Sequence, residues 1–102
     1  MDQPEVLIEY RNRSREAKIR LLLEASHQLT MVGRGAYHQG EIEKPEMLIR
    51  INEFQHRLLQ IIIDLVDGQP TRGDEEVSDY LFAGFTEFGA IHVLAQALVR
   101  GR

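Results

Sequence analysis

The fold is decided by residues 45–67, which read PEMLIRINEFQHRLLQIIIDLVD. Large apolar side chains recur here every three or four residues, as on one face of an α-helix; they are Met47, Ile51, Phe54, Leu58, Ile61, Ile62 and Leu65. Pro45 suits the first helical position, which needs no N–H, and Gly68 suits the residue after the helix. The stretch therefore predicts an amphipathic helix over about 45–67.

Glycine and proline interrupt the pattern on both sides of this helix, at residues 40–45 and 67–74. The preceding stretch, about 14–38, has one apolar face by the 3.6-residue period, made by Ile19, Leu22, Leu23, Ser26, Leu29, Thr30, Gly33 and Tyr37. The following stretch, about 75–99 with Asp74 as N-cap, has another, made by Val77, Leu81, Gly84, Phe85, Phe88, Ile91, His92, Ala95 and Val99.

Short connections between long helices favour antiparallel neighbours. We therefore predict a single all-α domain over residues 1–102, arranged as a three-helix antiparallel bundle or an up-down-up array. Residues 1–12 either extend the first helix or form a separate N-terminal arm.

Composition excludes several classes of protein. The 102 residues suffice for one domain, and the absence of cysteine excludes disulfides, thiol catalysis and thiolate metal sites. There is no apolar run of ~18 residues and no pattern of a signal peptide, so we expect no membrane span and a cytoplasmic location. The net charge of −4 argues against nucleic acid as a partner, although residues 11–20 carry five cations against one anion and could meet an acidic protein surface.

Four large apolar residues lie off the expected core faces and predict a second buried surface: Leu21, Ile49, Ile63 and Phe82. Three helices of this length make a thin core, and a second layer would bury more apolar area. We therefore expect a homodimer that completes a four- or six-helix bundle.

A Glu-x-x-His pattern occurs twice, at Glu24/His27 and at Glu53/His56. Carboxylate-bridged di-metal bundles use two such pairs, with further glutamates such as Glu87 from other helices. These side chains point away from the expected core, whereas a di-metal site needs ligands that point into the bundle. We therefore expect no metal and no cofactor, and keep a metal-binding bundle as the alternative.

Two further features belong to the third expected helix. His92 shares its apolar face, where we expect it to be buried and hydrogen-bonded to a residue such as Ser26 or Thr30. Gly84 and Gly89 indicate a close helix approach, and together with His92 they outline a possible groove for a small apolar ligand.

An acidic cluster flanks the second break and consists of Asp64, Asp67, Asp74, Glu75, Glu76 and Asp79. Helical pyrophosphatases that cleave nucleoside triphosphates hold Mg²⁺ with paired acidic motifs on neighbouring helices. No basic side chain for a phosphate is evident near this cluster, so we interpret it as a solvated acidic corner and keep the hydrolase as an alternative.

Residues 40–43 leading into residues 47–51, followed by residues 58–62, are similar in layout to the flagellin export chaperones. The resemblance covers about half the chain and implies a small helical protein that wraps a partner's helices. From the residues themselves we predict a non-enzymatic adaptor, chaperone or regulatory protein that acts through protein contacts. Its working surface would be the four off-face residues and the basic stretch Arg11–Arg20.

Overall fold

The computed structural model describes residues 2–40, 45–69 and 72–101. Within these ranges the chain is all-helical, as predicted, with five helices: α1 (Gln3–Arg11), α2 (Arg15–His38), α3 (Pro45–Val66), α4 (Asp74–Glu87) and α5 (Ile91–Arg100). The expected count of three is therefore wrong. The expectations for residues 41–44 and 70–71, including the start of the chaperone-like stretch, lie outside the described residues. In the ranges that the structure describes, no helix is both long enough and apolar enough to cross a bilayer.

The first difference from the prediction is that residues 3–11 form a helix of their own. Ser14 begins α2, and its hydroxyl accepts a hydrogen bond from the backbone N–H of Ala17 at 3.2 Å. This N-cap satisfies one of the free donors of the first turn, so the two helices are separate. Residues 3–11 therefore do not extend α2 but form a short helix that packs on α4.

The second difference is that the third expected helix is two helices, broken at residues 88–90. Gly89 adopts φ +65°, its N–H donates to the carbonyl of Thr86 at 3.0 Å, and the N–H of Ala90 donates to that of Phe85 at 2.7 Å. These bonds close α4 with a Schellman-type ending, which needs a residue that tolerates a positive φ. The break reorients α5, whose buried face is Val93, Leu94, Ala97 and Leu98.

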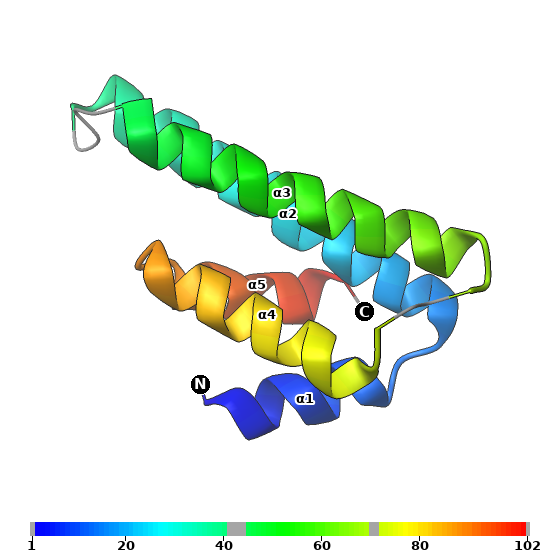
Figure 1. Cartoon of the computed structure of the whole chain (residues 1–102). Coiled ribbons are helices and arrows are strands. Elements are labelled where there is room, and N and C mark those ends of the chain that lie inside the picture. Colours follow the sequence, from blue (N-terminus) through cyan, green and yellow to red (C-terminus); the bar gives the residue numbers. More distant parts are fainter. Residues whose placement is uncertain (1, 41–44, 70–71, 102) are drawn as a thin grey trace.

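The helices stack in three layers (Figure 1). The antiparallel α2–α3 hairpin forms one outer layer, the α4–α5 hairpin lies against it, and α1 packs on the far side of α4. The core between the layers is continuous and apolar. The layer order covers only one side of the α2–α3 hairpin, and its other side faces away from the other described helices.

Phe54 of α3 anchors the contact between the two hairpins. Its ring stacks on Tyr80 with centroids 4.8 Å apart and meets Phe85 and Phe88 edge-on at 5.8 and 5.7 Å. Gly84 makes this possible, because a Cβ there would lie 2.0 Å from Cε2 of Phe54. The expected role of Gly84 in a close helix approach is therefore confirmed.

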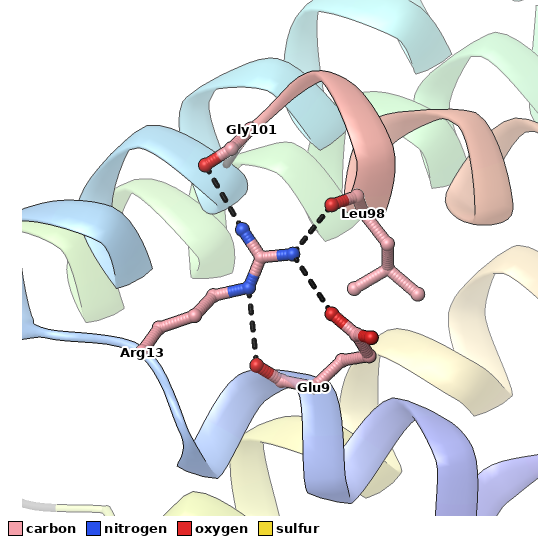
Figure 2. Close-up of polar contacts among 4 residues, drawn as sticks. All are labelled: Glu9, Arg13, Leu98 and Gly101. Carbon is pink, nitrogen blue, oxygen red and sulfur yellow. Dashed lines mark hydrogen bonds and ion pairs between the residues drawn. The ribbon is translucent and has the colours of Figure 1, made fainter.

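Arg13 ties the N-terminal helix to the end of the chain (Figure 2). Its guanidinium donates to the carbonyls of Glu9 at 3.1 Å and Gly101 at 2.9 Å, to the carbonyl of Leu98, and to the Glu9 carboxylate at 3.3 Å. Only 7% of the side chain is exposed. Arg13 thus supplies donors to the carbonyls at the end of α5, which have no partners within the helix.

Candidate interaction surface

A groove runs along the uncovered side of the α2–α3 hairpin. Its lining comes from both helices and consists of Leu23, Ser26, His27, Thr30, Asn52, Gln55, His56, Leu59 and Ile62. We call this side of the hairpin the outer face.

The floor of the groove is a hydrogen-bonded seam between the two helices. The side-chain amide of Gln55 donates to the carbonyl of Ser26 at 2.8 Å and to the hydroxyl of Thr30 at 2.5 Å, and that hydroxyl donates to the same carbonyl at 3.1 Å. The bonds fix the relative height of α2 and α3, so the groove is held in one shape.

The groove is apolar toward one end and carries no formal charge. Leu23 and Leu59 are 50% and 48% exposed, and Ile63 beside them is 43% exposed. None of the described residues that line the groove is Asp, Glu, Lys or Arg, although such residues make up 27% of the chain. Interface cores are depleted in charge in the same way.

The four residues predicted for an interface differ in their exposure. Ile49 and Ile63 are exposed, 55% and 43%, as that prediction requires. Leu21 is fully buried, because α5 and the C-terminus pack on its side of α2, where a Cβ on Gly101 would lie 2.9 Å from the Cα of Leu21. Its placement on a free surface is therefore wrong. Phe82 is half-buried against the core.

The structure brings together only the histidines of the two Glu-x-x-His patterns. His27 and His56 both line the groove, whereas Glu24 accepts a hydrogen bond from Gln28 at 2.8 Å and Glu53 lies exposed beyond the groove lining. Among the described residues, no three His, Asp or Glu side chains come together in a way that could hold a metal ion.

The possible small-ligand groove of Gly84, Gly89 and His92 is not formed. The space beside Gly84 is filled by Phe54, and Gly89 lies in the turn after α4. His92 is exposed instead of buried, because the break at Gly89 shifts the phase of α5. The hydrogen bond expected between His92 and Ser26 or Thr30 is replaced by the Gln55 seam.

Basic side chains lie among the acidic cluster, contrary to expectation. Lys18 donates to the Asp74 carboxylate at 2.9 Å, and Arg72 pairs with Glu76 at 3.5 Å. Asp74 is the first residue of α4 and not its N-cap, a position held by Gly73.

A pocket of about 280 Å³ lies beside the Lys18–Asp74 ion pair and is lined by Tyr10, Lys18, Asp64 and Asp74 among others. Burial, with a smaller contribution from Asp74, raises the pKa of Tyr10 to about 12.

The basic stretch is only partly available to a partner. Arg13 and Lys18 are used in contacts inside the molecule, while Arg11, Arg15 and Arg20 remain exposed.

Sequence reasoning missed the groove because it assigned Leu23, Ser26 and Thr30 to the core face. One signal in the sequence could have revealed it, namely alternating steps of four and three residues, the spacing of a coiled-coil seam. The steps run through Ile19, Leu23, Ser26, Thr30, Gly33 and Tyr37 on α2, and through Leu48, Asn52, Gln55, Leu59, Ile62 and Val66 on α3. This seam overlaps the core at Ile19 and Ile62, and its other residues include those through which α2 and α3 contact each other.

Comparison of the chain with protein-family models, with curated proteins and with solved structures finds no match. The resemblance to flagellin export chaperones therefore stays a prediction.

Proposed function

We propose that this chain is a non-enzymatic interaction protein that docks a helical surface of a polypeptide partner on the outer face of its α2–α3 hairpin. One observation carries the proposal. The outer face combines half-exposed leucine and isoleucine side chains with a groove that is free of formal charge.

Desolvation favours a partner helix on this face. Docking a helix on this face would remove the apolar area of Leu23, Leu59 and Ile63 from water, which is favourable by about 25 cal/mol per Å². It would leave no buried unpaired carboxylate or ammonium, the most expensive groups to desolvate. The Gln55 and Thr30 side chains already bond to each other and to the backbone carbonyl of Ser26.

The shape of the groove also favours a helical partner. Two antiparallel helices present parallel ridges with a groove between them, and amphipathic helices bind such grooves through residues spaced by three and four. The homodimer expected from the sequence belongs to this proposal, with the outer face in place of the original four-residue set. The metal-bundle alternative has less support, because neither Glu24 nor Glu53 lines the groove with the two histidines.

Position-specific photo-crosslinking tests the proposal whatever the identity of the partner. A benzophenone amino acid replaces Leu59 in the groove or, as the control, Ala83, which is exposed on α4. We expect discrete protein adducts from position 59 after irradiation in cells, with the groove peptide as the site of attachment. No adduct from position 59, or the same adducts from position 83, would overturn the proposal.

A further inference from the structure

We infer that the partner of the outer face is a second copy of this chain, related by a two-fold axis parallel to the helices of the hairpin. In this arrangement, α2 of one subunit packs antiparallel to α3 of the other and the two hairpins form a four-helix bundle. The inference rests on the proposed docking role of the outer face and names its partner.

The first support is that the steps of four and three residues through which α2 and α3 pack on each other also reach the outer face at the exposed Leu23 and Leu59. The four-and-three steps on α2 and on α3 each continue for more than two heptads without interruption. A single helix bound in the groove would cover the centre of the face only. Two helices with the same seams cover all of it, which a second hairpin provides.

The second support is that the seam residues match in layers. Gln55 bonds to Ser26 and Thr30, and the Cβ position of Gly33 lies 3.2 Å from Cδ1 of Ile51 and 4.0 Å from Cδ2 of Leu48. These contacts pair the two helices at equal heights. Leu23 and Leu59, which both line the groove, then form an apolar layer beside the polar layer of Ser26, Thr30 and Gln55. Polar seam residues of this kind set the register of helical bundles at some cost in stability.

The third support is that opposite charges border the two sides of the face. Seven-residue steps place Arg20, His27 and Arg34 in one row along α2, with His27 in the groove lining, and Glu46, Glu53 and Gln60 in one row along α3, with Asp67 just past its end. The five formally charged residues among them are all exposed, and none of them has an ion pair within the described ranges. Edge positions of this kind decide which helices pair and in what orientation.

The charges select one of the two possible two-fold axes. An axis in the interface and perpendicular to the helices would pack α2 on α2 and bring the basic edges together. An axis parallel to the helices packs α2 on α3 and brings the basic edge onto the acidic one. This axis also preserves height, so Arg34, next to Gly33, comes opposite the partner segment between Glu46 and Glu53.

The area of the face suits a stable dimer. The 22 residues of α3 span ~33 Å, and two helices ~9 Å apart make a face roughly 20 Å wide. The footprint is thus on the order of 650 Å² per subunit, close to the ~800 Å² per partner of standard interfaces.

Charge reversal tests both the partner and the axis. Arg34→Glu alone and Glu53→Arg alone each place like charges at two contacts per dimer, so each should weaken self-association on the order of tenfold at low salt. An equimolar mixture of the two variants forms a heterodimer in which both contacts are again between opposite charges. We therefore expect the mixture to associate within about threefold of the unmodified chain in sedimentation velocity.

Arg11→Glu is the control and should leave association unchanged, because Arg11 is exposed on α1, the layer on the far side of the molecule from the outer face. A mixture that associates no better than the single variants would contradict the two-fold axis parallel to the helices. An unmodified chain that stays monomeric would contradict the inference that the partner is a second copy. The proposed docking role would then be judged separately, by whether position 59 still crosslinks to a different protein.

Discussion

At the scale of single residues, close packing at Gly84 is the most specific demand that the fold makes on the sequence. The Phe54 ring occupies the place of a side chain at Gly84, and Tyr80, Phe85 and Phe88 surround that ring. We predict that Gly84→Ala lowers the free energy of unfolding by about 1–3 kcal/mol, because the ring has no free space to move into.

The matched control is Gly35→Ala. Gly35 is also helical, but a Cβ there would meet nothing within 4 Å among the described residues. Alanine should therefore raise the free energy of unfolding by roughly 0.5–1 kcal/mol through its higher helix propensity. Urea titrations of the two variants measure both effects. Equal changes in the two variants would show that Phe54 does not pack on Gly84.

The buried hydroxyl of Tyr10 makes the free energy of unfolding depend on pH in the alkaline range. Burial raises its pKa from 10.0 to about 12, so the folded state favours the neutral phenol. This contribution, on the order of 2 kcal/mol, is fully present below about pH 10 and is lost as pH rises through about 12. We predict that Tyr10→Phe loses less stability than the unmodified chain between pH 9 and about 12, measured by urea unfolding at each pH. Parallel losses in the two proteins would contradict the burial of this hydroxyl.

At the scale of helices, the sequence predicted α2 and α3 closely, because their apolar spacing is long and their ends carry Ser14, Pro45 and Gly68. The break between α4 and α5 was missed because a single glycine costs a helix only about 1 kcal/mol, which a long apolar pattern can outweigh. The helix ends here because the N–H of Gly89 donates to the carbonyl of Thr86 and the N–H of Ala90 to that of Phe85, and these bonds become visible only in three dimensions. Leu21 was misplaced for a related reason, since the helix that buries it lies about seventy residues further along the chain.

Helix α1 packs on α4 through the buried Val6 and Tyr10, and the Arg13 guanidinium links its end to the end of α5. We predict that Arg13→Met lowers the free energy of unfolding by about 2–3 kcal/mol, because the carbonyls of Leu98 and Gly101 lose charged donors in a buried place. Arg11→Met, at an exposed position two residues earlier, should change it by less than about 0.5 kcal/mol. Hydrogen exchange should show faster exchange at the end of α5 in Arg13→Met only. Unchanged exchange there would show that Arg13 does not hold the two ends together.

At the scale of the whole molecule, the candidate site was only partly predictable. A second apolar surface was inferred from Leu21, Ile49, Ile63 and Phe82. Only Ile49 and Ile63 are exposed, whereas Leu21 is buried and Phe82 is half-buried. The groove itself was not predicted. The apolar spacing of α2 and α3 is compatible with burial of either of two neighbouring faces, and only the position of α4 and α5 shows which face is covered. The charged rows of α2 and α3 were missed for a similar reason, because how they lie relative to each other depends on how α2 and α3 pack in the hairpin.

The mass of the untagged chain in solution tests the central claim most directly. Sedimentation equilibrium at neutral pH and low salt should give twice the 11.8 kDa of one chain, with dissociation on dilution. Leu59→Arg, which places a charge in the groove, should shift the equilibrium to the monomer, while Val99→Arg, at an exposed apolar position on α5, should leave the dimer intact. A monomer at all concentrations, or a dimer unaffected by Leu59→Arg, would contradict the outer face as the interface between two copies.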